Sequence, residues 1–176
     1  MNIVLFGDSL FARLKKGHLN QLESAITNAT VHNCATGGFN TSDGLRRAAF
    51  IANLPADRFI LCFGMNDCAP WKVVPIEEFE TNLLGILSAL GAERTSVITL
   101  PQVNEELQPG PNKRLNSLLA PYNHCIEQIC THSGATRIDT NPYFSPLEPY
   151  HASDGVHLNE IGENALLVAI RESIQR

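Results

Sequence analysis

Four short motifs contain the residue types that acyl transfer by a serine enzyme requires. They are Gly-Asp-Ser-Leu at residues 7–10, Gly-Gly-Phe-Asn at 37–40, Gly-Met-Asn-Asp at 64–67 and Asp-Gly-Val-His at 154–157. Together they supply a nucleophile, two oxyanion donors, an acid and a base. Any one motif would be weak evidence. All four follow apolar, strand-like runs, so the set predicts one catalytic site at the carboxyl ends of strands.

Ser9 is the candidate nucleophile because it sits in a tight turn between an expected strand and a short helix. A helix N-terminus favours negative charge, and the N–H of Ser9 can face a developing oxyanion there. The competing interpretation is a plain N-cap serine, which for this motif alone is the better one. Asp8 is interpreted as a carboxylate that stabilises the turn.

His157 is the candidate base, since a serine hydroxyl needs a neutral imidazole within hydrogen-bond reach. Asp154 lies three residues earlier and can bond the other ring nitrogen, which would fix the tautomer. The competing interpretation is a solvated acid and a histidine near a helix cap. The remaining histidines are interpreted as surface or packing residues: His18, His32, His124, His132 and His151. The interpretation has least support for His151, which shares the loop of Asp154.

Gly38 and Asn66 are the candidate oxyanion donors beside Ser9. Gly38 offers a backbone N–H at a position where a side chain would crowd a substrate, although Gly37 is a second glycine in the same turn. Asn66 can donate a side-chain N–H to the same oxygen. The alternatives are a turn glycine and a loop-capping asparagine. Asp67 is expected to brace its loop.

These residues need a scaffold that brings them to one edge, and the apolar pattern predicts one. Strand-like and helical segments alternate along the chain, which predicts an α/β fold with a parallel sheet and helices on both faces. In such sheets ligands bind beyond the carboxyl ends of the strands. The expected strands are residues 3–6, 31–34, 59–63, 96–100 and 136–138; the expected helices are 18–28, 42–53, 76–90, a segment with Pro121 near its first turn and Gly134 at its end, and 159–173.

Loops at 68–75, 101–112 and 140–153 should surround this edge, and they are short. Short loops suggest an open site and a small acyl group. Six aromatic residues lie on or near the expected edge and are candidates for a pocket, although about half of such residues would simply pack under loops. They are Phe11, Phe39, Trp71, Tyr143, Phe144 and Tyr150.

The composition of the chain limits the classes of partner that it could bind. The chain of 176 residues fits a single domain over 1–176, and its net charge of -5 with no basic stripe argues against a nucleic-acid partner. No run reaches transmembrane length and no signal peptide is evident, so we expect no stable membrane insertion. Five cysteines without CxxC spacing favour reduced thiols in a cytoplasmic protein and disfavour a zinc site.

The motif set resembles the SGNH hydrolase family, also called GDSL esterases or lipases, from residue 3 to residue 170. Ser9, Gly38, Asn66 and His157 match its four blocks, and residues 122–126 resemble its later helix. The resemblance implies a three-layer α/β/α sandwich with a five-stranded parallel sheet in flavodoxin-like order. It implies a triad of Ser9, His157 and Asp154, and an oxyanion hole of the Ser9 and Gly38 N–H groups with the Asn66 side chain.

The expected activity is therefore cofactor-free hydrolysis of a small-molecule carboxylic ester through an acyl-enzyme. Proteins of this family cleave simple esters, lysophospholipids, thioesters and acetyl groups on sugars, and no residue here selects among them. An acyltransferase that passes the acyl group to a sugar hydroxyl would use the same triad and stays open. A non-catalytic module is disfavoured because no part is missing. A flavodoxin-type nucleotide site is disfavoured because residues 7–10 are too short and glycine-poor to cradle phosphate.

Overall fold

A five-stranded, all-parallel sheet forms the centre of the molecule. The computed structural model describes residues 1–145 and 149–175. The strand order is β2-β1-β3-β4-β5, with Val4 of β1 facing His32 of β2 and Phe59 of β3. This order confirms the expected flavodoxin-like sheet. The strands are β1 (Asn2–Gly7), β2 (Thr30–Asn33), β3 (Arg58–Cys62), β4 (Thr95–Ile98) and β5 (Thr136–Ile138).

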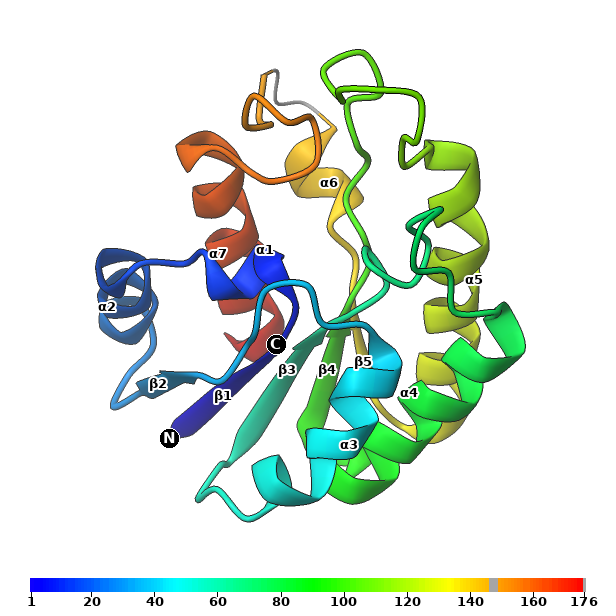
Figure 1. The fold of residues 1–176 in the computed structure, drawn as a ribbon. Coiled ribbons are helices and arrows are strands. Elements are labelled where there is room, and N and C mark those ends of the chain that lie inside the picture. The colour runs from blue at the N-terminus through cyan, green and yellow to red at the C-terminus, as the bar shows by residue number, and fades with distance from the viewer. Residues whose placement is uncertain (146–148, 176) are drawn as a thin grey trace.

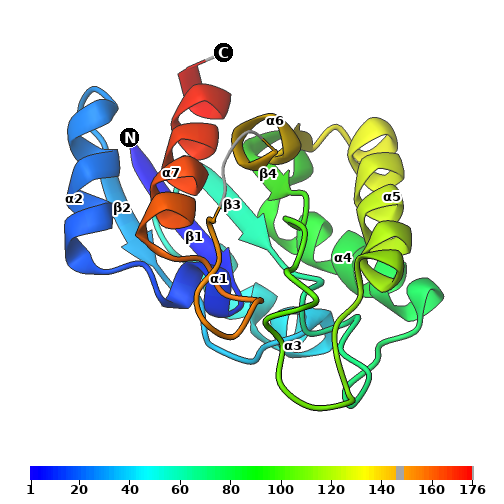
Figure 2. The ribbon, with the colours of Figure 1, turned by 90° about the horizontal axis from the view of Figure 1, so that it is seen from above.

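Helices cover both faces of this sheet and complete the three-layer sandwich (Figures 1 and 2). Helices α2 (Lys16–Ala25) and α7 (Glu160–Gln175) pack together on one face. Helices α3 (Thr41–Ala52), α4 (Ile76–Leu90) and α5 (Asn116–Ser133) pack in a row on the other. Parallel strands are joined by right-handed crossovers. Helix α2, which joins β1 to β2, therefore lies on the opposite face from α3, α4 and α5, because the chain crosses the sheet in the other direction after β2.

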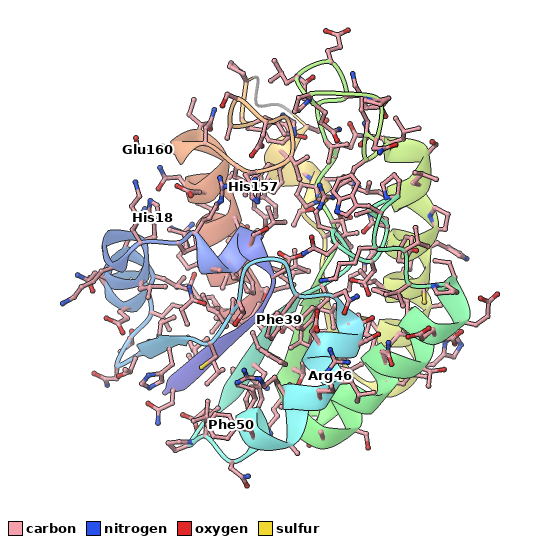
Figure 3. The ribbon with its side chains drawn as sticks, viewed as in Figure 1. His18, Phe39, Arg46, Phe50, His157 and Glu160 are labelled. Atoms are coloured by element: carbon pink, nitrogen blue, oxygen red, sulfur yellow. The ribbon has the colours of Figure 1, made fainter. Side chains whose placement is uncertain are left out.

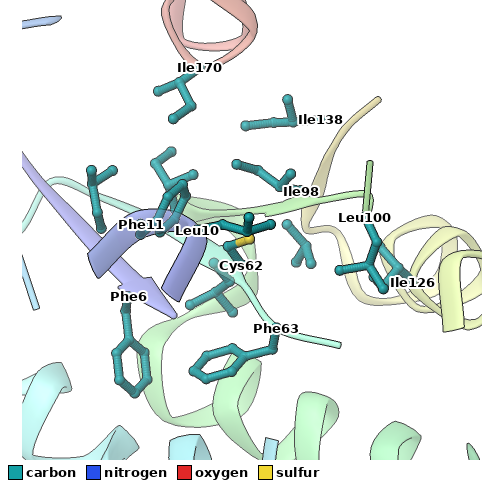
Figure 4. Packing of buried hydrophobic residues seen from close by; sticks show 14 of the residues in the cluster. Phe6, Leu10, Phe11, Cys62, Phe63, Ile98, Leu100, Ile126, Ile138 and Ile170 are labelled. Carbon is teal, nitrogen blue, oxygen red and sulfur yellow. The ribbon is translucent and has the colours of Figure 1, made fainter. Parts of the chain in front are cut away.

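The core consists of the apolar runs on which the strand expectations rested. Residues 59–62 of β3 are fully buried, as a central parallel strand requires. Phe6 and Phe63 point to the α3–α4 face and meet edge to face, with ring centroids 5.1 Å apart. Figure 4 shows Ile138 and Ile170 on the other face of the sheet, toward α7. Burying each such side chain stabilises the fold by roughly 1.5–3 kcal/mol.

Some element boundaries differ from the expectation for identifiable reasons. Helix α5 begins at Asn116, so Pro121 lies in its second turn rather than near its first. A proline there leaves one helical carbonyl without its usual partner, which the long, well-packed helix tolerates. Two short helices were not expected: α6 (Asn141–Phe144), inside the loop at 140–153, and the 3₁₀ helix Ala92–Arg94, after α4. Both are single turns, too short for an apolar period to reveal.

None of the helices in residues 1–145 and 149–175 has the length and apolar character needed to cross a bilayer.

The short helix α1 (Ser9–Ala12), which follows β1 directly, is the element that carries the candidate nucleophile.

Candidate active site

The structure brings Ser9, His157 and Asp154 into one hydrogen-bonded chain. The Oγ of Ser9 lies 2.9 Å from the Nε2 of His157, and the Nδ1 of His157 lies 2.6 Å from the Oδ2 of Asp154. Ser9 is the first residue of α1, at the carboxyl end of β1, and His157 lies just before α7. Figure 3 shows His157 beside α1, with Phe39 at the same edge and Phe50 at the far end of α3.

Asp154 is held in place by backbone as well as by the imidazole. Its Oδ1 accepts hydrogen bonds from the N–H groups of Val156 (3.0 Å) and His157 (2.9 Å). Burial disfavours the charged carboxylate, but these bonds and the one from the His157 ring outweigh burial and lower the pKa of Asp154 to about 2. An ionised Asp154 only accepts, so Nδ1 must carry the proton and Nε2 is left to accept from the Ser9 hydroxyl.

Asp8 forms the turn that presents Ser9, as expected. It is the N-cap of α1, and its Oδ1 accepts from the N–H of Leu10 at 2.9 Å. The carboxyl group is fully buried, which the sequence did not indicate. Burial raises the pKa of Asp8 to about 7; the Leu10 bond opposes this shift, and the charge of Asp67 adds to it. The Asp8 carboxyl therefore holds a proton for much of the time at neutral pH.

Two backbone donors at the site are free to bind an oxyanion. Within the described residues, no hydrogen bond engages the N–H of Ser9 or of Gly38. Gly38 has a φ of +81°, and a Cβ there would meet no atom within 4 Å. Within the protein, backbone conformation rather than space is therefore what favours glycine. A Cβ on Gly37 would lie 3.9 Å from the Cβ of Ser9, so both glycines border the nucleophile.

The Gly38 turn is held by a lysine from another loop. The Nζ of Lys72 donates to the carbonyl oxygen of Gly38 and lies 3.3 Å from the Oδ2 of Asp43. Asp43 also accepts from the N–H of Asn40 at 3.1 Å. Lys72 therefore ties the turn to the first turn of α3, and no motif pointed to this residue.

Asn66 faces the same turn from the loop that follows β3. Its Nδ2 donates to the carbonyl oxygen of Phe39 at 2.9 Å, and its Oδ1 accepts from the Nη2 of Arg114 at 3.1 Å. One hydrogen of the Nδ2 remains for a further acceptor. Asp67 braces the loop as expected, because its Oδ1 accepts from both the N–H (2.9 Å) and the hydroxyl (2.5 Å) of Thr41.

The aromatic candidates divide as the general rule suggests. Phe11, Phe144 and Tyr150 are buried and pack under loops or helices. Trp71 is 58% exposed, and its ring covers the guanidinium of Arg114 with 4.7 Å between centroid and Cζ. Arg114 was missed by sequence reasoning, since an arginine in a loop rich in proline, glycine and asparagine looks like an ordinary solvated residue.

The described residues place no group of three or more His, Cys, Asp or Glu side chains where they could hold a metal ion. The five cysteines are free thiols, and all but Cys34 are buried.

An α/β fold with these residues gathered at the carboxyl edge of its sheet is the arrangement of an acylhydrolase. The model of the GDSL-like Lipase/Acylhydrolase family matches residues 5–165. The chain belongs to this family and is a carboxylic ester hydrolase.

Similar solved structures share this fold. A lipase/acylhydrolase from Enterococcus faecalis is 22% identical, with a TM-score of 0.88 over 99% of this chain and 95% of that one. The psychrotrophic esterase EstA from Pseudoalteromonas sp., inhibited by monoethylphosphonate, is 17% identical, with a TM-score of 0.74 over 99% and 96%. The acetyl xylan esterase AlAXEase is 16% identical, with a TM-score of 0.80 over 99% and 100%. A comparison with curated protein sequences found no match.

Proposed function

We propose that the protein is a serine esterase that cleaves a small-acyl carboxylic ester through an acyl-enzyme on Ser9. The observation that carries the proposal is the continuous chain from Ser9 Oγ through the His157 ring to Asp154, with bonds of 2.9 and 2.6 Å. The 2.9 Å distance lies within the range that proton transfer from a nucleophile to its base requires, and the 2.6 Å bond to Asp154 orients the ring of that base.

The chemistry follows from this geometry. The Oγ of Ser9 attacks the ester carbonyl carbon while its proton passes to the Nε2 of His157, and the charged imidazole is stabilised by Asp154. The carbonyl oxygen becomes an oxyanion that the N–H groups of Ser9 and Gly38 and the Nδ2 of Asn66 are positioned to bind. The intermediate collapses, the C–O bond to the alcohol breaks, and His157 returns its proton to the leaving oxygen.

Water then completes the cycle. His157 takes a proton from a water molecule, the resulting hydroxide attacks the acyl carbon, and the second intermediate releases the carboxylic acid and regenerates the Ser9 hydroxyl. Gly38 is exposed and the Asp154 side chain is 38% exposed, so solvent can reach the site. This access supports hydrolysis. Transfer of an acetyl group to or from a sugar hydroxyl would need only that the sugar hydroxyl replace water in the step that attacks the acyl-enzyme.

The proposed substrate is a free small-molecule ester, with neither nucleic acid nor a membrane as partner. An open site with short loops supports a small acyl group. The five free thiols support a reducing compartment, which for this protein we take to be the cytoplasm.

The test combines covalent labelling with a substrate panel. A fluorophosphonate should label Ser9 alone, and Ser9→Ala should lose both labelling and several orders of magnitude in kcat. Aryl esters of increasing acyl length should be cleaved fastest when the acyl group is short. Adding sugar acceptors to the assay distinguishes transfer from hydrolysis. Labelling at another residue, or near-normal turnover by Ser9→Ala, would refute the proposal.

A further inference from the structure

Arg114 reaches the candidate oxyanion hole from outside every recognised motif. Its Nη2 donates to the Oδ1 of Asn66 at 3.1 Å, and its Nε donates to the carbonyl oxygen of Met65 at 2.7 Å. We propose that Arg114 is a positioning residue that fixes which end of the Asn66 side chain faces the substrate. The proposal rests on the proposed function, because it assumes that Asn66 binds the oxyanion.

The donor inventory of the guanidinium supplies the reason. Arginine has five N–H donors and no acceptor, so it can bond Asn66 only through the Oδ1. With the Oδ1 held by Arg114, the Nδ2 faces the Gly38–Phe39 turn, where one hydrogen bonds the Phe39 carbonyl oxygen and the other is available. If the amide turned over, its oxygen would face a developing negative charge, and the repulsion would raise the barrier.

Arg114 is itself held in one geometry on several sides. The ring of Trp71 covers the guanidinium. The buried side chain of Gln108 accepts from the Arg114 N–H (2.8 Å) and donates to the Arg114 carbonyl oxygen (2.7 Å). The stacking restrains the guanidinium, and the two bonds to Gln108 restrain the Arg114 backbone. The side chain therefore loses little conformational freedom when it binds Asn66. The site is thus set before a substrate arrives.

The same loop also contacts the segment that carries the base. The N–H of Asn104 donates to the carbonyl oxygen of Gly155 at 2.8 Å. Gly155 has a φ of +71°, and a Cβ there would lie 2.3 Å from the carbonyl oxygen of Asn104. Residues 104–114 therefore connect the Asp154–His157 turn to Asn66. A segment with no catalytic motif can in this way hold the Asp154–His157 turn and Asn66 in fixed positions relative to each other.

A double-mutant cycle between Arg114 and Asn66 tests the proposal. Arg114→Ala should lower kcat for an aryl ester by roughly tenfold to a hundredfold, the range for losing a hydrogen bond to a charged group, with little change in KM. In the Asn66→Ala background the same substitution should change kcat by less than about twofold, because its target is gone. Arg114→Lys should recover little, since a single ammonium cannot reproduce the fork that reaches both Met65 and Asn66.

Arg94→Ala is the matched control. Like the Arg114 guanidinium, that of Arg94 donates to two acceptors, here the backbone carbonyl oxygens of Leu90 and Ala56. It also stacks on an aromatic ring, that of Phe59 at 4.9 Å, but it lies at the opposite end of the sheet. This variant should lower the melting temperature and leave kcat unchanged. If Arg114→Ala does not fold, Arg114→Lys carries the cycle.

Three outcomes separate the hypotheses. Additive losses in kcat for Arg114→Ala and Asn66→Ala would overturn the positioning role while leaving the proposed function intact. A rise in KM that persists in the Asn66→Ala background would instead assign Arg114 to substrate binding and also overturn it. A normal kcat in Asn66→Ala, with fluorophosphonate still labelling Ser9, would remove Asn66 from the oxyanion hole and the positioning role with it.

Discussion

The Nε2 of His157 lies 2.9 Å from the Oγ of Ser9, although 148 residues separate them in the chain. The two side chains come from α1, at the end of β1, and from the turn before α7. Because the Nδ1 proton of His157 is committed to Asp154, the Nε2 can accept the Ser9 proton only while the imidazole is neutral.

The rate of ester hydrolysis should therefore fall with decreasing pH once the imidazole is protonated, and about pH 7 to 5 is the range to measure. Asp154 cannot cause this fall, since its pKa of about 2 keeps it ionised throughout that range. Measuring kcat/KM against pH, with circular dichroism to verify the fold at each point, checks this. A rate that stays flat down to pH about 5 would point to a base other than His157.

Asn66→Ala should lower kcat by roughly a hundredfold to a thousandfold with little change in KM, the usual cost of losing one oxyanion donor. Asn66→Asp should be at least as damaging because it places a negative charge beside a developing one. The competing interpretation makes Asn66 a loop cap. Steady-state kinetics and melting temperatures on the same variants decide between them: a lower melting temperature with unchanged kcat would favour the cap.

Gly38→Ala should lower both stability and kcat. A φ of +81° costs an L-residue about 1–2 kcal/mol, and relief of that strain would turn the Gly38 N–H away from the site. Gly134→Ala is the control, because Gly134 has the same φ of +81° and equally open surroundings but caps α5. Both variants should melt at lower temperature, and only Gly38→Ala should lose turnover. Equal kcat values in the two variants would count against an oxyanion role for Gly38.

Asp8→Asn should flatten the pH dependence of stability. The folded chain retains the Asp8 proton between pH about 4 and 7, whereas the unfolded chain loses it near 3.8, so the free energy of unfolding falls as the pH rises through that window. Asparagine keeps the N-cap and carries no charge. The difference in melting temperature between Asp8→Asn and the wild type should therefore be more favourable to the variant at pH 8 than at pH 5.

Asp139→Asn provides the comparison for this measurement. Asp139 makes the same kind of bond to the N–H two residues on, that of Asn141, but at an exposed position. The change in melting temperature that Asp139→Asn causes should be similar at pH 5 and at pH 8. A pH-independent effect of Asp8→Asn would show that its buried carboxyl is not protonated in the folded state.

Much of the fold followed from local patterns in the sequence. The apolar run at 59–63 predicted a central strand, and the helical period from Ile76 to Leu90 ends where Gly91 adopts a φ of +86°. Such signals depend on burial and backbone preference, which each residue expresses locally. The four motifs likewise placed Ser9, Gly38, Asn66 and the Asp154–His157 turn at one edge, because all carboxyl ends of a parallel sheet lie on the same side.

The tertiary structure alone decided which residues support that edge. Arg114 and Lys72 lie in loops with no periodicity, and their roles depend on partners 48 and 34 residues away, Asn66 and Gly38. The burial of the Asp8 carboxyl was equally hidden, since the turn it forms would exist at a surface too. A sequence encodes donors and acceptors, but long-range packing determines which of them meet and how much water remains between them.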